Sequence, residues 1–311
     1  MSDRAATGDG VHVSDGARAN TSVAANTDTR PERMLKPLDS STFGVIEKPL
    51  STWEKLYQRP SLRKTFLLVA LALIWEIYAR LLNNPLLFPT FSATVAAFIE
   101  GIATGGLLGK AWYSIRVLLI GYAVGITCAA LLTAIAISSR IGTDLLETLT
   151  SMFNPLPAIA LLPLALLWFG LGPGSLVFVL VHSVLWAVAL NTHSGFLSVS
   201  NTLRMVGRNC GLKGPAYVAR ILIPAAFPSI LTGLKIGWAF AWRTLIAAEL
   251  VFGVSSGSGG LGWFIYENKN QLEIPSVFAG LFSVILIGLT VENVIFRNIE
   301  LRTVRRWGMQ G

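Results

Sequence analysis

Residues Ser198–Pro228 read SVSNTLRMVGRNCGLKGPAYVARILIPAAFP and lie between two long apolar runs of the chain. Four basic residues occur in this stretch, Arg204, Arg208, Lys213 and Arg220, and no Asp or Glu balances them. Loops rich in Lys and Arg stay on the cytoplasmic side of a membrane. The stretch is therefore predicted to be a cytoplasmic loop between two membrane spans.

Two short helices are predicted within this loop. The first covers residues 198–210 and carries Leu203 and Val206 on one apolar stripe, together with the cysteine at its end. The second begins at Pro215, since proline is favoured in a first helical turn, and ends before Pro224. An amphipathic helix pair between membrane spans presents an apolar stripe that another surface must cover.

The composition of the 311-residue chain indicates an integral membrane protein. Hydrophobic residues make up 53% of it and charged residues 14%, and the mean hydropathy is +0.60. One soluble core of ordinary composition cannot bury that much apolar surface. The net charge of +8 does not predict a nucleic-acid partner. The basic residues are distributed according to the side of the membrane on which each segment is predicted to lie, and they form no single patch. Cys128 and Cys210 support no disulfide framework, and the sequence predicts no metal site and no cofactor.

Six apolar runs have the length of about 20 residues that a hydrocarbon core of about 30 Å requires. They are approximately Thr65–Leu82, Trp112–Ile137, Leu145–Phe169, Ser175–His193, Ser229–Phe252 and Val277–Phe296. Between the first two, Ser92–Ala103 is weakly amphipathic. This segment is predicted to lie along the outer interface, with Ser92 as its N-cap.

The domain organisation follows from the same pattern. Residues 1–46 are rich in Ser, Thr, Asp, Asn, Gly and Ala, so they predict a disordered cytoplasmic tail. Residues 47–64 are a basic segment that suits the membrane interface and its anionic lipid. The transmembrane domain is predicted to cover residues 65–311 and to include the loop 198–228.

Orientation follows from counting charges. With the N-terminus inside, fourteen Lys and Arg flank the cytoplasmic ends of the spans, and three, Arg80, Lys110 and Lys269, lie outside. This imbalance places both termini in the cytoplasm.

The loop also contains a spaced motif. Gly211 is followed after nine residues by Ile221-x-Ile223-Pro224. This spacing resembles the signature loop of ATP-binding cassette (ABC) importer permeases, in which a Gly is followed at that distance by I-x-L-P. The Glu-Ala-Ala that opens the family signature is replaced here by residues 205–207, Met-Val-Gly, which resembles the variant of the nitrate/sulfonate/taurine branch.

Three other stretches resemble the same family. Residues 155–174 read PLPAIALLPLALLWFGLGPG, and the second span opens with Ser-Ile-Arg-Val at 114–117. Residues 255–262, SSGSGGLG, lack the Gly-Lys-Ser/Thr of a phosphate-binding loop. They resemble the G-x-G-G-L-G turn on the face that meets a periplasmic binding protein. The resemblance covers about Leu86–Leu301.

The resemblance implies an all-α integral membrane protein of the type I ABC importer permease fold. Such a protein has six transmembrane helices, with a cytoplasmic coupling-helix loop between spans four and five, and is multi-pass in the cell inner membrane. The implied partners are a second permease copy forming a homodimer, two ABC ATPase subunits and a periplasmic substrate-binding protein. The chain itself would be a transport subunit and no enzyme, and its cargo a small anion such as a sulfonate, taurine, nitrate or bicarbonate. The implied ATPase-coupling residues are Arg204, Val206, Gly207, Arg208, Gly211, Leu212, Lys213, Tyr217, Ile221 and Pro224.

Ionisable residues within a span cost about 2.5–3.5 kcal/mol each at the membrane centre, so each needs a partner or a pathway. The candidates are Glu76, Arg116, Lys235, Arg243, Glu249 and Glu292. All except Arg243 and Glu249 lie near a span end, where snorkelling to the interface is expected. At about 100° per residue, Arg243 and Glu249 are separated by about 120° around the helix axis, so one straight helix cannot aim both at one point.

We predict that Arg243, with Trp242 beside it, lines the translocation cavity, where a cation favours an anionic cargo. Arg116 and Glu249 are further candidates for the substrate pathway. The competing explanation is a structural ion pair, such as Glu249 with Arg116. The alternative function is an ion-gradient-driven secondary transporter of small organic anions, with Glu249 or Glu76 as the coupling carboxylate, although the inverted repeats expected of that class are not evident.

The third predicted span contains Asn154–Pro157 and Pro163. These prolines predict either an ordinary kink or a break that protein or a water-filled cavity must surround. His182 and His193 are expected to be packed and hydrogen-bonded instead of catalytic.

Two pairs of glycines are each spaced four residues apart, Gly121 with Gly125 and Gly233 with Gly237. The two glycines of each pair therefore lie on the same face of their helix. Small residues let helix backbones approach closely in a membrane. Helix packing within the chain is the expected explanation, and a dimer seam is the alternative.

Overall fold

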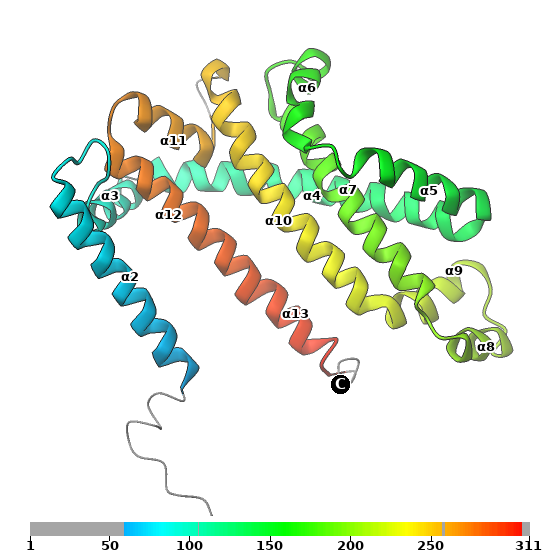
Figure 1. Cartoon of the computed structure of the whole chain (residues 1–311). Helices are drawn as coiled ribbons and strands as arrows, with labels where there is room; N and C mark the ends of the chain where they lie inside the picture. The colour runs from blue at the N-terminus through cyan, green and yellow to red at the C-terminus, as the bar shows by residue number, and fades with distance from the viewer. Residues whose placement is uncertain (1–58, 105, 257–258, 307–311) are drawn as a thin grey trace, which may run out of the picture. The chain divides into compact units, whose positions relative to one another are not determined.

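The structure, a computed structural model, describes residues 59–104, 106–256 and 259–306, with no side-chain description at 252–256. The predicted tail 1–46 lies outside the described residues, as do positions 47–58 of the interfacial segment and part of the glycine-rich turn 255–262. Every regular element among the described residues is helical (Figure 1). In chain order these are α2 (Pro60–Leu82), α3 (Phe91–Ala103), α4 (Gly106–Ser138), α5 (Arg140–Phe153), η2 (Ala158–Leu161), α6 (Leu162–Phe169), α7 (Pro173–Leu197), α8 (Asn201–Asn209), α9 (Gly214–Tyr217), η3 (Val218–Leu222), α10 (Ile223–Ser256), α11 (Leu261–Asn270), α12 (Ile274–Thr290), η4 (Val291–Phe296) and α13 (Arg297–Arg302).

Within the described residues, five unbroken helical runs are long and apolar enough to cross a membrane. They are Pro60–Leu82, Gly106–Ser138, Pro173–Leu197, Gly214–Val251 and Ile274–Arg302. The run predicted as Leu145–Phe169 is divided into α5 and the pair η2–α6, which meet at 87°. The predicted number of six spans is reached when this bent pair counts as one crossing. The chain is thus a multi-pass membrane protein.

The break in the third span lies at Asn154–Pro157, directly after α5. Pro155 and Pro157 have no backbone N–H, and each ring disfavours a helical conformation in the residue before it. Pro157 itself is extended, with φ −60° and ψ 121°, before η2 begins. The helix is therefore interrupted here, and the simple kink is the wrong alternative.

Helix α7 is the centre of the fold, because it packs between α4 and α10. In the apolar 18-residue stretch of α7, half of the residues are buried inside the chain, whereas in the corresponding stretch of α2 the share is 6%. The main core cluster consists largely of residues from α4, α7 and α10, including Leu118, Leu180 and Leu245. The position of α7 therefore determines which residues of α4 and α10 face each other.

Glycines let both neighbours approach α7 closely. A Cβ atom at Gly121 would lie 2.7 Å from Leu180 Cβ, and one at Gly233 would lie 2.8 Å from Asn191 Cβ. The second glycine of each pair also lies against α7. Carbon atoms pack no closer than about 3.5 Å, so a larger residue does not fit at these contacts. The prediction that these glycines pack helices within one chain is confirmed.

The fifth span begins earlier than predicted, and the prediction that Pro224 ends a helix is wrong. Helix α9 continues through η3 into α10, so one helical run extends from Gly214 to Val251. The turn η3 is π-helical, with hydrogen bonds from i to i+5. Pro224 then falls in the first turn of α10, where the run tolerates its missing N–H.

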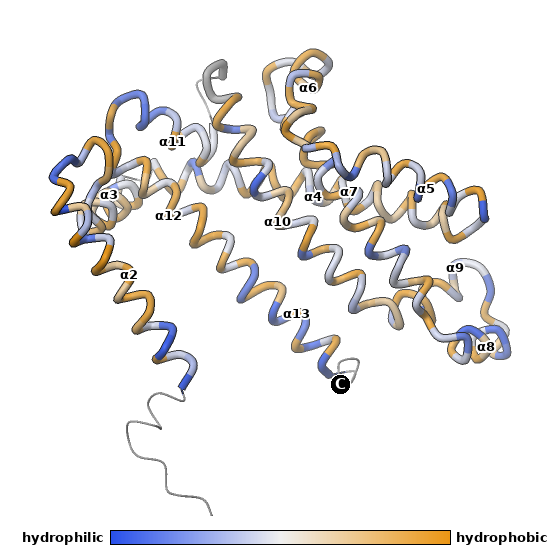
Figure 2. The backbone as a smooth tube through the Cα atoms, in the orientation of Figure 1, coloured by the Kyte–Doolittle hydropathy of each residue, from blue (hydrophilic) through white to orange (hydrophobic). Residues whose placement is uncertain are grey.

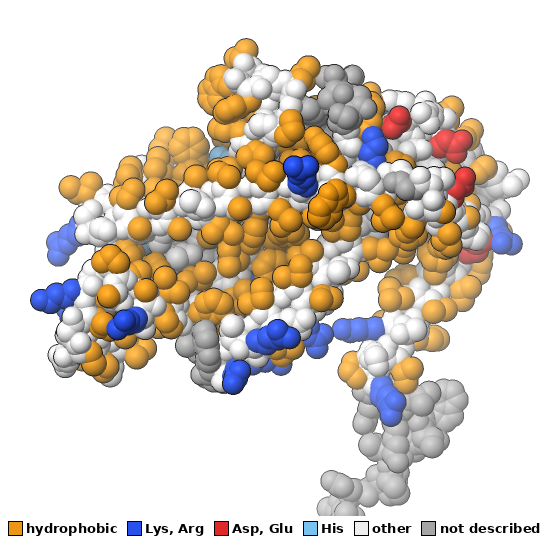
Figure 3. All heavy atoms as spheres, turned by 180° about the vertical axis from the view of Figure 1, so that it is seen from behind, with side chains coloured by type: hydrophobic (Ala, Val, Ile, Leu, Met, Phe, Trp, Pro, Cys, Tyr) orange, Lys and Arg blue, Asp and Glu red, His pale blue; other side chains and the backbone are white. Residues whose placement is uncertain are grey.

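The loop helices α8 and α9 and the C-terminal helix α13 lie at the same end of the helical unit, opposite α11 (Figure 1). The backbone is largely apolar along α7, α10 and α12 and hydrophilic at α8 (Figure 2). Seen from behind, apolar side chains cover most of the middle, acidic side chains gather near one end, and most basic ones lie toward the other (Figure 3). An apolar band between charged ends suits contact with lipid acyl chains.

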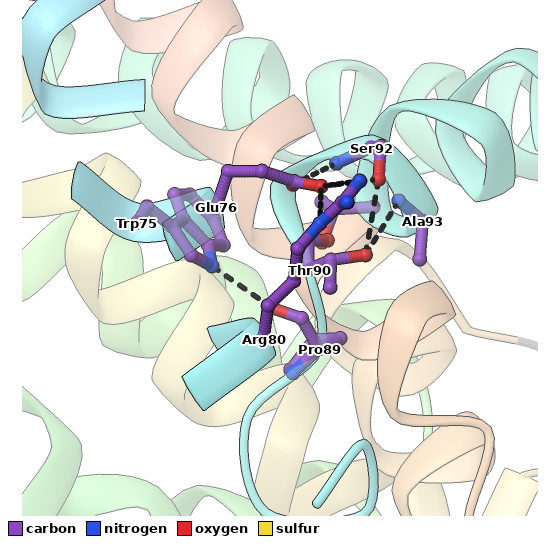
Figure 4. Close-up of polar contacts among 8 residues, drawn as sticks. Trp75, Glu76, Arg80, Pro89, Thr90, Ser92 and Ala93 are labelled. Carbon is purple, nitrogen blue, oxygen red and sulfur yellow. Dashed lines mark hydrogen bonds and ion pairs between the residues drawn. The ribbon is translucent and has the colours of Figure 1, made fainter. Parts of the chain in front are cut away.

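Glu76 connects the end of α2 to the start of α3 (Figure 4). Its Oε2 accepts the Ser92 N–H at 3.0 Å, its Oε1 accepts the Ser92 hydroxyl at 3.0 Å, and Arg80 Nη2 lies 2.7 Å from Oε1. The carboxylate is thus held by the start of α3 and by Arg80, and the snorkelling of Glu76 to the interface stays a prediction. The prediction that Ser92 is the N-cap is wrong, since Thr90 Oγ1 accepts the Ala93 N–H at 3.1 Å.

The substitution Gly121→Leu tests the packing around α7. We expect it to lower the melting temperature of the purified chain in detergent by about 3–10 °C, because overpacking a tight contact costs about 1–3 kcal/mol. The matched control is Gly109→Leu in the same helix, where a Cβ atom would meet nothing within 4 Å. An equal loss in both variants would contradict the packing assigned to Gly121.

Candidate functional site

A cavity of about 360 Å³ lies beside the break in the third span. The broken span contributes residues 154–159, α7 contributes His182, Ser183 and Trp186, and α10 contributes Phe240, Arg243, Thr244 and Ala247. The proline-rich break therefore forms one wall of this cavity. Irregular backbone at membrane depth is tolerated where it lines such a space.

Arg243 supplies the positive charge of the cavity. Its Nε donates to the carbonyl of Ala239 at 3.1 Å, and its guanidinium carbon lies 5.5 Å from the centre of the Phe240 ring. The side chain is exposed, and no carboxylate pairs with it among the described residues. No Asp or Glu of the described residues lines the cavity. The guanidinium is therefore available to an anion, for which charge-assisted hydrogen bonds are strong.

Neutral polar groups surround this cation. Both ring nitrogens of His182 and the indole Nε1 of Trp186 are buried without a hydrogen-bond partner among the described residues. The hydroxyls of Ser183 and Thr244 lie 3.1 Å apart and connect α7 to α10. Buried polar groups without a partner are costly, so these atoms favour water or a polar ligand in the cavity.

Glu249 lies outside this cavity, in a buried polar cluster that joins α4, α10 and α11. It is 2% exposed, and Ser114 Oγ lies 2.8 Å from each carboxylate oxygen. The Gly262 N–H donates to Oε2 at 2.9 Å, while Ser114 Oγ accepts the Leu261 N–H at 2.9 Å. A Cβ atom at Gly260 would lie 2.3 Å from Oε1, so glycine is required where the chain passes the carboxylate. These hydrogen bonds offset the cost of burying Glu249.

The loop between α7 and α10 is tied to the end of α7. Arg204 donates through Nε to the Val199 carbonyl at 3.1 Å and through Nη2 to the Phe196 carbonyl at 2.6 Å. Helix α8 is shorter than predicted and starts after Ser200, whose hydroxyl accepts the Leu203 N–H at 3.4 Å. Gly211 turns the chain after α8 with φ +74°, a conformation that favours glycine.

Helix α8 packs against its own chain at one position and is exposed at others. A Cβ atom at Gly207 would lie 2.9 Å from both Ile221 Cγ1 and Tyr217 Cε2, so the glycine lets α8 lie directly against α9 and η3. Elsewhere on the same helix, Leu203 is 44% exposed and Val206 is 50% exposed. Among the residues that the structure describes, the predicted apolar stripe is therefore uncovered.

The model of the family described as "Binding-protein-dependent transport system inner membrane component" matches residues 121–304, which is more than half of the chain. The chain belongs to this family. It is a permease subunit of an ABC importer, in the nitrate/sulfonate/taurine branch that its sequence resembles.

Several relatives of this permease align along most of their own length. A protein of Methanocaldococcus jannaschii named as an ABC transporter permease is 33% identical over 223 residues, covering 70% of this chain and 82% of the relative. A protein of Bacillus subtilis named as an aliphatic sulfonates transport permease is 28% identical, covering 75% and 83%. The nitrate import permease protein of Synechocystis is 27% identical, covering 82% and 94%. Permeases of this family work with an ATPase and a substrate-binding protein, and the matches do not support the secondary-transporter alternative.

The structure places the permease's predicted pathway residues in four different environments. Arg243 lines the cavity at the break, whereas Glu249 lies in the cluster with Ser114. Trp242 is buried in the core, and its Nε1 donates to the Val284 carbonyl at 3.2 Å. Arg116 is exposed on α4. The suggested pair of Glu249 with Arg116 is wrong, because the carboxylate bonds to Ser114 and to the start of α11, which lie closer.

Two other charged residues of the spans differ in their contacts. Lys235 pairs with Glu300, and both side chains are partly exposed. This pairing offsets the cost of the charge, and the snorkelling of Lys235 to the interface stays a prediction. Glu292 is exposed on η4.

Sequence reasoning missed His182 and Trp186 as cavity residues of the permease. It expected His182 to be packed and hydrogen-bonded, yet neither ring nitrogen has a partner among the described residues. A weak signal was available, because the two residues are four apart and therefore share a helix face. Only the contact of α7 with α10 shows that this face meets Arg243.

The substitution Ser114→Ala tests the buried cluster. It leaves the Glu249 carboxylate with one hydrogen bond fewer and the Leu261 N–H without its acceptor, which costs about 1–3 kcal/mol per buried group. We expect the melting temperature in detergent to fall by about 3–10 °C. Ser138→Ala in the same helix, where the hydroxyl is exposed and bonds only to Ala134 O, is the control and should change little. A Ser114→Ala variant as stable as the control would show that the cluster does not hold α4 and α11 together.

Proposed function

We propose that the permease forms, with a second copy of itself, the pathway by which a small anion enters the cell. The observation that carries this proposal is the guanidinium of Arg243, which faces the cavity at the broken span without a carboxylate partner among the described residues. The names of relatives that carry sulfonates, nitrate and taurine support an anionic cargo. Sulfonate, taurine, nitrate and bicarbonate are the cargo classes we propose.

The cavity suits passage better than tight capture. One cation attracts an anion, and the neutral polar atoms of His182 and Trp186 offer dipoles but no second full charge. An anion bound by one guanidinium in a hydrated cavity can leave it again, as transport requires. Selection among anions then rests mainly with the substrate-binding protein, and the permease selects for charge.

Two separate ATPase subunits hydrolyse ATP in this proposal, and each docks on one loop. The exposed stripe of Leu203 and Val206 on α8 supports this docking. The proposed contact set includes Arg204, Gly207, Arg208, Gly211, Leu212, Lys213, Tyr217, Ile221 and Pro224. A periplasmic binding protein meets the opposite end, near α11.

The geometry of α10 explains how force reaches the cavity. The helical run that begins at Gly214 in the loop is the same run that carries Arg243. At 1.5 Å per residue, about 39 Å of continuous helix separates Tyr217 from Arg243. A push on the loop by the ATPase therefore tilts the cavity wall directly, and the two copies alternate between inward-open and outward-open states.

The substitution Arg243→Gln tests the pathway. We expect anion uptake by the complex, reconstituted with its ATPase and binding protein in liposomes, to fall at least tenfold, because a charge-assisted hydrogen bond is worth about 1.5–3 kcal/mol. Arg243→Lys, which keeps the charge, should retain part of the uptake. Arg302→Gln, an exposed arginine on α13, is the control and should transport normally. Normal uptake by an assembled Arg243→Gln complex would refute the role of this residue.

Native cysteines allow a test of the proposed orientation, in which the loop and both termini are cytoplasmic. Cys210 is exposed in the loop, and Cys128 can be removed by Cys128→Ala. A membrane-impermeant maleimide should then label Cys210 in inverted vesicles and not in intact spheroplasts. A cysteine introduced by Lys269→Cys in a Cys128→Ala, Cys210→Ala background should show the reverse pattern. Labelling of Cys210 from outside would overturn the orientation and the docking of the ATPase on this loop.

A further inference from the structure

A second cavity, of about 770 Å³, lies at the loop end of the permease and shares no lining residue with the cavity at the broken span. Its walls come from the end of α4, the start of α5, the end of α7 and the segment from α8 to the start of α10. The space is large enough for a small organic molecule, since ligand sites usually measure about 300–1,000 Å³. It therefore forms a separate site between the α4–α5 turn and the coupling loop.

The lining of this cavity is basic. Arg140, Arg204 and Arg208 line it, and no Asp or Glu does in the part of the chain that the structure describes. Arg204 is held in place by its hydrogen bonds to the end of α7. Arg140 and Arg208 are exposed, and no carboxylate pairs with either among the described residues. Three guanidinium groups around one space attract an anion with several oxygens.

Two residues of the cavity lining carry a buried polar atom that has no hydrogen-bond partner among the described residues. His193 is 3% exposed, and its Nε2 has no hydrogen-bond partner among the described residues. The same holds for the hydroxyl of Tyr217, which comes from α9. Both residues line the cavity. A buried polar atom without a partner is costly, and a ligand with oxygen atoms would satisfy both.

We propose that this cavity is a binding site for a phosphate-bearing anion. The phosphate group lies between Arg140 and Arg208 and hydrogen-bonds to both, while the remainder of the molecule lies against the apolar wall that includes Phe196 and Leu222. The phosphate group belongs either to the headgroup of an anionic phospholipid or to a soluble phosphate compound. Because Arg140 follows α4 and Arg208 belongs to α8, the bound anion bridges the α4–α5 turn to the coupling loop. Its effect on transport rests on the proposed function, whereas its binding does not.

Binding can be measured on the purified full chain without the ATPase. One arm places the chain in nanodiscs of phosphatidylcholine with and without phosphatidylglycerol, and the other adds inorganic pyrophosphate to nanodiscs of phosphatidylcholine alone. We expect at least one probe to raise the melting temperature of the wild-type chain in a saturable way. Stabilisation by phosphatidylglycerol alone identifies a lipid headgroup site, and stabilisation by pyrophosphate identifies a site for soluble phosphates.

Variants connect this binding to the cavity. The double substitution Arg140→Gln/Arg208→Gln should weaken binding at least tenfold, since both side chains are exposed and removal of either is not expected to unfold the chain. The matched control is Arg220→Gln/Arg302→Gln, which removes the same charge from two exposed arginines outside the cavity. Tyr217→Phe removes only a hydroxyl and should weaken binding about threefold to tenfold.

Two results would overturn the site. One is a wild-type chain that neither probe stabilises, and the other is equal loss of binding in the cavity variant and in the matched control. Either result would leave the Arg243 experiment unaffected, because that experiment measures uptake through a different cavity.

Discussion

The close packing of α7 against α4 and α10 is the contact on which the rest of this permease depends. Gly121 and Gly233 allow it, because each lies where a Cβ atom would collide with a side chain of α7. In a membrane, lipid is as apolar as the helix surface, so helices associate through tight van der Waals contact. This packing brings the face of α7 with His182 and Trp186 against the face of α10 with Arg243. The cavity thus depends on helix contacts made by glycines that do not line it themselves.

A second constraint is that backbone polar groups at membrane depth need partners. The prolines after Asn154 remove N–H groups and interrupt the third span, and the interruption is tolerated because it lies beside α7 and α10. At the other end, the π-helical turn before Pro224 keeps the loop and α10 in one helical run. One proline-rich segment therefore interrupts a span of the permease beside a cavity, while another leaves a long helical run intact. The number of prolines does not distinguish these outcomes, but the hydrogen bonding around them does.

Much of the fold and part of the candidate site could be predicted from the sequence. The apolar runs predict the spans, the Gly211 and Ile221 spacing resembles the family signature, and Arg243 is predicted to line a cavity. The partners of Glu76, Lys235 and Glu249 could not be predicted. Glu249 bonds to Ser114, which is 135 positions away in the chain, and no local pattern reveals such a contact. The helix boundaries around Pro224 were wrong because a proline alone does not show whether the preceding turn is α-helical or π-helical.

Hydropathy, run length and motif spacing are properties of the chain read along one dimension, so they suffice to predict a multi-pass membrane permease. The tertiary structure is needed to show which polar side chains share a space. It separated Arg243 from Glu249, although both belong to α10, and it brought His193, Arg140 and Arg208 from three different helices around one cavity. The physical reason is that burial, pairing and cavity lining arise from contacts between helices, and those contacts depend on how closely the backbones approach.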